Sequence, residues 1–387
     1  MTYLIPLSMR RVIASLLVLL AFATGVAVGR ATNEGGRPAG PTWSVVGELA
    51  RTRAYASAVA VETGEILVFG GLDREAPGVT LSTSELFDPS TGRVTELPGS
   101  VLGRLNQAAT TVSGGRVVVT GGTEWLGGDW NSVAVVDIYW PWPRVWTHAS
   151  TMLQARSDHA ATALSDGRLL VVGGNYNARP LRSAEIYDPR TDVWTPVRPM
   201  PRSRTMHSAA TLPDGRVLVV GGVQEDGLPT ASTFLYEPWR DQWVEGPRSL
   251  EVRANHSMIQ LSDGDVLLFG GEPNGAGNAE RYSWREGRFV YVGTLGLPRL
   301  VAQAAGLPDG RVIAVGGLAE DRWRQRFDPT KAAELWDPRW NTWSDLPPAP
   351  TGRAYAQLVV TDRGIYRLSG IGEDQVPHST IEMLSLP

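Results

Sequence analysis

The sequence predicts an all-β protein in which one unit of about fifty residues is repeated seven times. Three patterns recur in a fixed order: a hairpin turn between strand-forming runs, a pair of glycines, and an Asp-Pro turn followed by an aromatic residue. The glycine pairs are Gly70-Gly71, Gly121-Gly122, Gly173-Gly174, Gly221-Gly222, Gly270-Gly271 and Gly316-Gly317, with a degenerate seventh copy at Gly370-Ile371. Such a period is typical of folds that stack one supersecondary unit several times.

The first two strands of each repeat form a hairpin. In four repeats an Asp-Gly pair separates the two runs, and both residues tolerate the positive φ that a two-residue hairpin turn requires. These pairs are Asp166-Gly167, Asp214-Gly215, Asp263-Gly264 and Asp309-Gly310. The second strand is apolar at consecutive positions, as in residues 169–172, so both of its faces are expected to be buried. This requires sheets that pack face to face.

A third and a fourth strand follow the glycine pair. The third ends in a Glu-x-x-Asp-Pro turn, and the fourth carries a large apolar residue. The best copies are Glu85 to Pro89 with Val94, Glu185 to Pro189 with Trp194, and Glu334 to Pro338 with Trp343. Proline after aspartate ends the strand ladder, and the large side chain can fill the wedge between neighbouring sheets. We therefore expect four antiparallel strands per repeat.

In this order of motifs, residues 42–387 resemble the kelch family, whose repeats are the blades of a β-propeller. Six whole repeats are followed by three C-terminal strands at 353–360, 365–370 and 380–385. The segment 42–46 has the composition of the missing fourth strand, so we expect it to complete a seventh blade and close the ring. The alternative is that Trp43 belongs to a linker. The resemblance is specific for the fold, since kelch propellers include adaptor domains, a few enzymes and secreted proteins.

The N-terminal residues predict location. Arg10 and Arg11 precede the uncharged residues 12–29, and residues 30–41 form a Gly- and Pro-containing linker. We predict that residues 1–29 are a helical signal peptide or a transmembrane signal-anchor, the two alternatives being open because a loose cleavage motif ends at Gly29. The positive flank places the propeller outside the cytoplasm, either secreted or attached to the membrane. Lys331 is the only lysine, a bias typical of GC-rich, and here we expect bacterial, genomes.

Composition excludes several classes of function. The net charge is −4 without a long run of like charge, so no nucleic-acid partner is expected. The absence of cysteine excludes disulfides and thiolate catalysis. Residues 214–222 resemble the corresponding passage of galactose-oxidase-like proteins, whose copper-radical cofactor needs a Cys cross-linked to a Tyr and is therefore excluded. Sialate-mutarotase-like chemistry, which the family also includes, stays open, and no cofactor is expected.

An arginine opens the hairpin of every repeat. The seven are Arg53, Arg104, Arg156, Arg204, Arg253, Arg299 and Arg353. Sevenfold repetition would place them around one mouth of the central channel, where they could bind a carboxylate or a sulfated glycan. The favoured interpretation is structural: each arginine holds a neighbouring blade through carbonyls and carboxylates, because repetition in every blade is what a fold requirement produces.

Three histidines follow their arginines at one repeat position, namely His159, His207 and His256. Imidazoles on adjacent blades suggest a metal site. However, other repeats have Ala or Gln at this position, and His148 and His378 lie apart from it. We therefore predict packing residues and no bound metal. The Glu-x3-Asp-x3-His iron motif of plant specifier proteins is also absent.

Two irregular loops are the predicted ligand site. Residues 123–131 contain Trp125 and Trp130, and residues 319–329 contain Trp323, Arg324 and Arg326. Trp and Arg in exposed loops are typical of sugar-binding and protein-binding surfaces, unless the rings fold back onto the scaffold. In kelch propellers these loops share a face with the arginines. The predicted function is an extracytoplasmic module that binds a glycan or a protein; the alternative is a galactose-oxidase-like or sialate-mutarotase-like carbohydrate-active enzyme without the Cys-Tyr cofactor.

Overall fold

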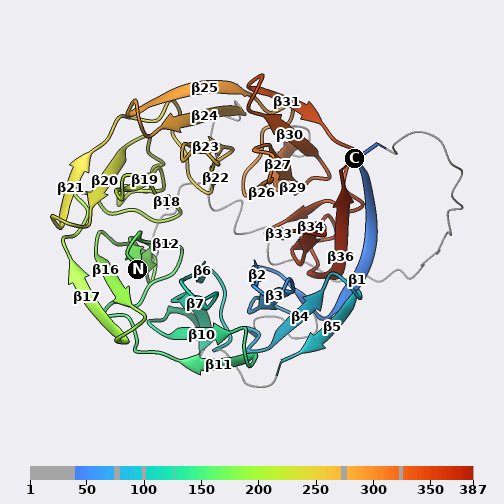
Figure 1. Cartoon of the computed structure of the whole chain (residues 1–387), viewed down its shortest axis with the longest axis horizontal. Coiled ribbons are helices and arrows are strands. Elements are labelled where there is room, and N and C mark those ends of the chain that lie inside the picture. Colours follow the sequence, from blue (N-terminus) through green and yellow to red (C-terminus); the bar gives the residue numbers. More distant parts are fainter. Residues whose placement is uncertain are drawn as a thin grey trace, which may run out of the picture.

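A computed structural model describes residues 40–73, 79–97, 102–126, 128–271, 277–321 and 326–386. Seven four-stranded antiparallel sheets surround a common centre in this part of the chain (Figure 1). The predicted all-β, seven-bladed propeller is thus confirmed. Among the described residues no helix has the length and apolar character needed to cross a membrane. The predicted N-terminal helix (1–29) and most of the linker lie outside the described residues.

Each blade contributes its first strand to the inside of the ring and its fourth to the outside (Figure 1). Blade 1 consists of β2 (Ser57–Ala60), β3 (Ile66–Phe69), β4 (Ser84–Asp88) and β5 (Arg93–Glu96). Blade 2 consists of β6 (Ala108–Thr111), β7 (Val117–Thr120), β10 (Val136–Trp140) and β11 (Val145–His148). Blade 3 consists of β12 (Ala160–Ala163), β13 (Leu169–Val172), β16 (Ala184–Asp188) and β17 (Val193–Val197). Blade 4 consists of β18 (Ser208–Thr211), β19 (Val217–Val220), β20 (Thr233–Glu237) and β21 (Gln242–Glu245).

The remaining blades repeat this order. Blade 5 consists of β22 (Ser257–Gln260), β23 (Val266–Phe269), β24 (Asn278–Ser283) and β25 (Arg288–Thr294). Blade 6 consists of β26 (Gln303–Gly306), β27 (Val312–Val315), β30 (Ala333–Asp337) and β31 (Thr342–Asp345). Blade 7 consists of β33 (Gln357–Thr361), β34 (Gly364–Leu368), β36 (His378–Ser385) and β1 (Thr42–Arg53). Two-stranded hairpins are added at β8 (Thr123–Leu126) with β9 (Asp129–Ser132), β14 (Asn175–Tyr176) with β15 (Arg179–Pro180), β28 (Leu318–Asp321) with β29 (Arg326–Pro329), and β32 (Arg353–Ala354) with β35 (Ile371–Gly372).

The two ends of the chain close the ring. Strand β1 pairs antiparallel with β36, from Thr42 opposite Ser385 to Arg53 opposite His378, with two irregularities in register. The Trp43 indole Nε1 donates a hydrogen bond to the carbonyl of Pro347 in the adjacent blade at 2.9 Å. The expected split blade is confirmed, so Trp43 belongs to a strand and not to a linker. Closure gives blade 7 its fourth strand, so each of the seven blades has four.

The core lies between neighbouring blades. The second strand of each of blades 1 to 6 is fully buried, as the runs of consecutive apolar residues predicted, and in blade 7 only the first residue of this strand is partly exposed. Between blades 3 and 4, for example, Leu170 and Val172 pack with Val217 and Val219. The fourth-strand aromatic fills the wedge: buried Trp194 packs with Ile138 of blade 2. Packing of this kind must be repeated around the whole ring, because each blade covers the face of the next.

The glycine pairs join each blade to the next one. The N–H of the second glycine donates to the carbonyl of the following blade's arginine at all seven interfaces, at 2.7–3.3 Å. At the seventh, Gly370 donates to Arg53, and Ser369 takes the first position with φ +59°. The sequence-based assignment of Gly370-Ile371 as the seventh pair is therefore wrong by one residue. Glycine is needed at the first position elsewhere: a Cβ at Gly121 would lie 2.3 Å from the carbonyl oxygen of Arg156.

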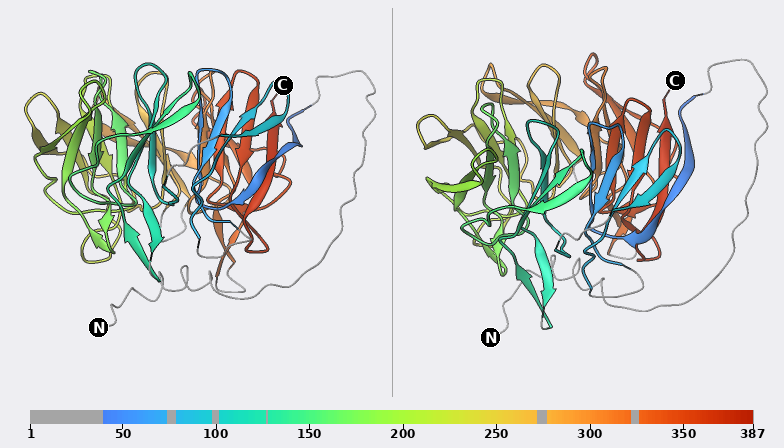
Figure 2. Two further views of the ribbon diagram at one scale, coloured as in Figure 1. Left: turned by 90° about the horizontal axis from the view of Figure 1, so that it is seen from below. Right: turned by 60° about the horizontal axis from the view of Figure 1, so that its bottom comes forward.

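The ring has two different faces. On the loop face, the fourth strand of one blade joins the first strand of the next, and the β8–β9 and β14–β15 hairpins lie on this face. On the turn face lie the Asp-Gly turns and the Asp-Pro turns. Figure 2 shows the β8–β9 hairpin projecting from one face, whereas the start of β1 and the end of β36 lie at the opposite face.

Candidate functional site

The seven arginines are inside the blades, with side chains that are at most 3% exposed. Arg156 is representative: its Nη2 lies 2.7 Å from the Glu185 Oε1 atom, and its Nη1 donates to the Gly173 carbonyl at 2.7 Å. Both partners belong to blade 3, whose hairpin Arg156 precedes, so the side chain does not make the expected contact with a neighbouring blade. Arg53 differs, because it ends β1 of blade 7 and its side chain reaches Glu85 of blade 1. Guanidinium groups buried in this way do not line the channel.

Six arginines have a buried carboxylate as partner. These carboxylates are Glu85, Asp137, Glu185, Glu280, Glu334 and Glu382. Blade 4 is different, because Phe234 occupies the carboxylate position and the Arg204 guanidinium lies 4.6 Å from its ring centroid. Burial, and to a lesser extent Arg202, lowers the pKa of Arg204 to about 10. A cation–π contact thus replaces an ion pair in this blade.

Two residues after each arginine, the backbone turns toward the axis of the ring. The residue at this position has a φ between +47° and +56° in every blade. We call these seven residues the hub: Tyr55, Asn106, Asp158, Met206, Asn255, Val301 and Tyr355. Main-chain hydrogen bonds of 3.1–3.2 Å connect five of them in sequence, from Asn106 to Val301. The hub is the part of the loop face nearest the channel.

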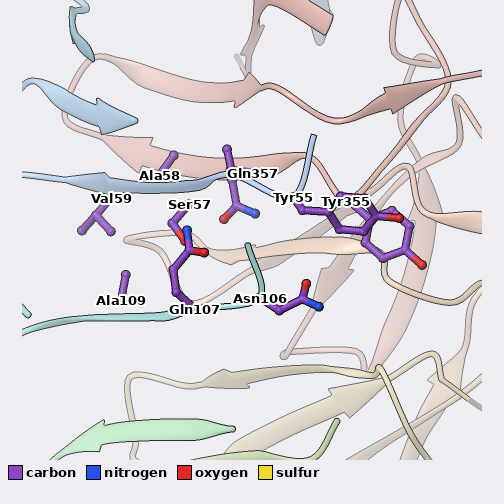
Figure 3. Close-up of a pocket in the computed structure, with 10 residues that line it drawn as sticks. Tyr55, Ser57, Ala58, Val59, Asn106, Gln107, Ala109, Tyr355 and Gln357 are labelled. Carbon is purple, nitrogen blue, oxygen red and sulfur yellow. The ribbon is translucent and has the colours of Figure 1, made fainter. Parts of the chain in front are cut away.

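A cavity of about 300 Å³ adjoins the hub between blades 7, 1 and 2 (Figure 3). Tyr55, Tyr355 and Asn106 contribute from the hub, and Gln107 and Gln357 contribute from the inner part of the blades. The two tyrosine rings lie 4.3 Å apart between centroids. A cavity of this volume, lined by apolar side chains together with a few amide and hydroxyl groups, is typical of sites that bind small ligands.

Hydrogen-bonding capacity remains in this cavity. The Gln107 Nε2 atom donates to the Ser57 hydroxyl at 3.0 Å, but the Gln107 Oε1 atom is buried without a protein partner. Burial raises the pKa of Tyr55 and of Tyr355 above their usual value, so both hydroxyls stay protonated. The cavity therefore presents neutral donors and acceptors, which suit an uncharged, hydroxyl-rich ligand.

Asp158 is the titratable residue of the hub. Burial raises the pKa of its carboxyl to about 6, although hydrogen bonds from Ser157 at 3.1 Å and from Asn175 at 2.8 Å lower it. Both bonds end on the Oδ2 atom. The charge of Asp158 also contributes to the raised pKa of Tyr55 and of Tyr355, although Asp158 is not among the residues that line the cavity. A carboxyl group in this range can carry or release a proton near neutral pH.

The three histidines are buried packing groups. His159 shares a 2.8 Å hydrogen bond with Thr120 of the preceding blade, and a Cβ added at Gly173 would lie 2.5 Å from the His207 ring. Burial lowers the pKa of all three, to about 3 for His256. In the described ranges, no three His, Cys, Asp or Glu side chains are grouped so that they could hold a metal ion.

The two predicted binding loops lie in different parts of the ring. Trp125 and Trp130 face each other across the β8–β9 hairpin, with ring centroids 5.0 Å apart, and each is 41% exposed. Arg326 lies on β29 in blade 6, where its Nε donates to Asp328 at 2.9 Å. Trp323 and Arg324 lie outside the described residues. Blades 7 and 1 lie between blades 2 and 6, so the described parts of the two loops do not adjoin.

The β8–β9 hairpin is attached firmly at its base. Thr123 and Leu105 exchange two main-chain hydrogen bonds, of 2.7 and 3.0 Å. Beside it, the Ser132 N–H donates to the Asn177 side chain of blade 3 at 3.0 Å. The tryptophan pair is thus held at a defined place on the loop face.

Sequence reasoning missed the hub, Asp158 included. The hub position varies from Tyr to Asn, Asp, Met and Val, so it does not stand out as a motif. The available signal was its constant place, two residues after the arginine and one before the histidine position.

Comparison with known proteins supports the fold. Residues 41–222 match the KLHDC2/KLHL20/DRC7 Kelch-repeats domain family. A fungal alcohol oxidase of the AA5 family in complex with copper superposes with a TM-score of 0.71 and 19% identity, covering 89% of this chain and 76% of the oxidase. YjhT superposes with a TM-score of 0.59 and 15% identity, covering 75% of this chain and 97% of YjhT. No curated protein matches the chain in sequence.

The residues present do not fit a copper site of the Cys-Tyr kind. The sequence has no cysteine, and the hub tyrosines are accompanied by Asp, Asn, Met and Val instead of histidine. The three histidines that share a repeat position are packed against glycines between blades, as described for His207. At these identities the likeness to the oxidase concerns the fold alone. By its repeats and its seven blades the described part of the chain is a seven-bladed β-propeller, and its residues 41–222 match a kelch-repeat family.

Proposed function

We propose that this propeller is an extracytoplasmic binding module that recognises a glycan or a protein ligand through its loop face. The observation that carries the proposal is the pair formed by Trp125 and Trp130. Large aromatic side chains are costly to leave in water, and they are frequent anchors in both carbohydrate and protein interfaces. A pair on a firmly attached hairpin is already ordered, so binding loses little conformational entropy.

Neighbouring residues enlarge this surface. Leu126 at the tip of β8 and Tyr176 on the adjoining β14 are also exposed. Together with the tryptophan pair they form an apolar surface that spans blades 2 and 3, with polar Asn131 and Asn177 beside it. Kelch domains generally mediate protein binding, which supports a recognition role. Under this proposal, the ligand first contacts the surface on the β8–β9 hairpin.

The test is a binding measurement on single-tryptophan variants. A glycan array and an affinity purification with the purified full chain identify the ligand, and its affinity is then measured for Trp125→Ala and Trp130→Ala. Loss of an anchor typically costs about 2 kcal/mol, which is roughly 30-fold in Kd. Trp142→Ala is the matched control, because Trp142 is also exposed but lies on the turn face.

Two results would oppose the proposal. Full affinity in both hairpin variants together with a lower melting temperature would make the rings packing residues. An equal loss of affinity in the Trp142 control would show that the effect does not come from the loop face.

The extracytoplasmic location has its own test. The charged flank and the uncharged segment 12–29 support export of the propeller. A reporter fused after Pro387 should be active only outside the cytoplasm. Activity of a cytoplasmic reporter at the same position would contradict this part of the proposal.

A second candidate function, a carbohydrate-active enzyme without a Cys-Tyr cofactor, is favoured by Asp158. Its carboxyl, with a pKa of about 6, belongs to the same hub as the two cavity tyrosines and could transfer protons to and from a sugar hydroxyl. Interconversion of the anomers of reducing sugars, followed by NMR, tests it. If the activity exists, Asp158→Asn should reduce it by about 10²- to 10⁴-fold. The exposed Asp166→Asn is the control, and no acceleration by the unmodified protein would remove this candidate.

A further inference from the structure

The turn face carries the most exposed aromatic side chains of the described residues. Trp142, Trp239 and Trp340 are 71%, 58% and 74% exposed. Each lies on the turn between the third and fourth strands of its blade, in blades 2, 4 and 6. We call these three residues the Trp rim. Indole rings that are this open are not covered by neighbouring blades, so most of their surface is available to a partner.

Arginines accompany the Trp rim, but they add little net charge. Arg240 lies 3.2 Å from the carboxylate of Glu237, and Arg339 lies 2.6 Å from that of Asp337. The Trp rim is therefore aromatic and polar without being strongly cationic. Indole rings with polar neighbours are typical of groups that lie at the boundary between water and lipid headgroups.

The chain enters the propeller on this same face. Thr42, the first residue of β1, is opposite Ser385, the last residue of β36, and β1 then runs from the turn face to the loop face (Figure 2). The twelve residues of β1 span at most about 40 Å. The point of entry is thus on the turn face and one whole blade away from the loop face.

The length of the linker decides which face can lie near a membrane. Twelve residues, 30–41, separate the uncharged segment 12–29 from β1. A Gly-containing chain of that length has a root-mean-square span of about 20 Å, which is less than the roughly 27 Å that the eight residues of β36 rise between the two faces. Only a linker close to full extension, about 40 Å, would reach past the loop face. A membrane that contains residues 12–29 is therefore expected on the side of the turn face, where the chain enters the propeller.

We infer that the turn face rests on the surface of a phospholipid bilayer, with the Trp rim at the level of the headgroups and the loop face directed away from the membrane. The inference depends on retention of residues 1–29. It also gives a reason for the separation of the two tryptophan sets: one attaches the propeller, and the hairpin pair stays free for a ligand.

The experiment uses the full chain in phosphatidylcholine proteoliposomes. Because the chain has no cysteine, single Cys variants carry a donor fluorophore without competing labels. Ser90→Cys places the donor on an exposed turn of the turn face, and Glu225→Cys places it on an exposed loop of the loop face. An acceptor dye on the lipid headgroups then reports distance by energy transfer. Transfer should be efficient from position 90 and weak from position 225.

Variants of the two tryptophan sets complete the test. Changing all three Trp-rim residues to Ala should reduce transfer from position 90, whereas Trp125→Ala with Trp130→Ala should leave it unchanged. Equal transfer from both positions, no effect of the Trp-rim variant, or recovery of a protein without residues 1–29 would each overturn the inference. Ligand binding by the Trp-rim variant is expected to be normal, so this failure would be distinct from failure of the proposed function.

Discussion

Glu185 offers a sharp test of how the blades are held together, because blade 4 already contains a natural replacement for this group. Its Oε1 atom lies 2.7 Å from the Arg156 Nη2 atom, and its Oε2 atom accepts a 2.6 Å bond from the Leu153 N–H. In blade 4 the carboxylate is replaced by Phe234, and the residue equivalent to Leu153 is Pro201, which has no N–H to donate. Blade 4 therefore lacks both the carboxylate and the N–H group that would donate to it.

The loss of stability in each variant depends on which buried groups it leaves without a partner. Glu185→Ala leaves a buried guanidinium without its charge partner and should lower the free energy of unfolding by about 3–5 kcal/mol. Glu185→Phe should cost less, since a ring below the guanidinium returns about 1–2 kcal/mol of cation–π attraction. Adding Leu153→Pro to Glu185→Phe removes the donor that Phe cannot satisfy, so the double variant should show a favourable coupling of about 0.5–3 kcal/mol.

Urea unfolding followed by tryptophan fluorescence measures these differences, and Asp166→Ala serves as control. Asp166 pairs with Arg168 on an exposed turn, so its loss should cost less than about 1 kcal/mol. The reasoning is refuted if Glu185→Phe is as destabilising as Glu185→Ala, or if Leu153→Pro costs the same with Glu and with Phe at position 185.

Three further predictions concern closure, the seventh glycine pair and pH. Removal of residues 1–40 should leave a cooperative fold, whereas removal of 1–47 exposes two edges of blade 7; equal melting temperatures would contradict the shared blade. Ser369→Gly should stabilise the protein by about 1 kcal/mol, because it relieves a positive φ, while Gly316→Ser should destabilise it through contact with the Arg353 carbonyl; thermal melts that show the reverse order would contradict the assignment. Burial lowers the pKa of the three inter-blade histidines below 6.5, so the unfolded chain binds more protons and stability should fall below about pH 6.5, by up to about 1.4 kcal/mol per pH unit for each histidine. The raised pKa of Asp158 has the opposite effect, because it makes the folded protein more stable as the pH falls from about 6 to about 4. Replacing the three histidines by Gln should make the melting temperature depend less on pH below about 6.5, and an unchanged dependence would refute their role.

Local backbone chemistry was open to prediction from the sequence. Asp-Gly and Gly-Gly pairs indicate positions where φ must be positive, and runs of consecutive apolar residues indicate strands that are buried on both faces. Repetition of these signals in one order determined the blades, and the composition of residues 42–46 determined how the ring closes. The same kind of local signal misplaced the seventh glycine pair, because Ser369 adopts a glycine-like φ without being a glycine.

Side-chain partners needed the tertiary structure. The sequence showed an arginine in every repeat, but whether a guanidinium such as that of Arg156 points into the channel or into its own blade depends on which strand lies opposite it. The hub tyrosines, 300 residues apart in the chain, meet only because the ring closes. Position on a face is likewise a property of the ring: Trp130 and Trp142 are near neighbours in sequence, yet one strand carries the chain from the loop face to the turn face between them. Turns and strands were set by the chemistry of adjacent residues, whereas burial, pairing and direction were set by contacts between blades that the order of residues does not record.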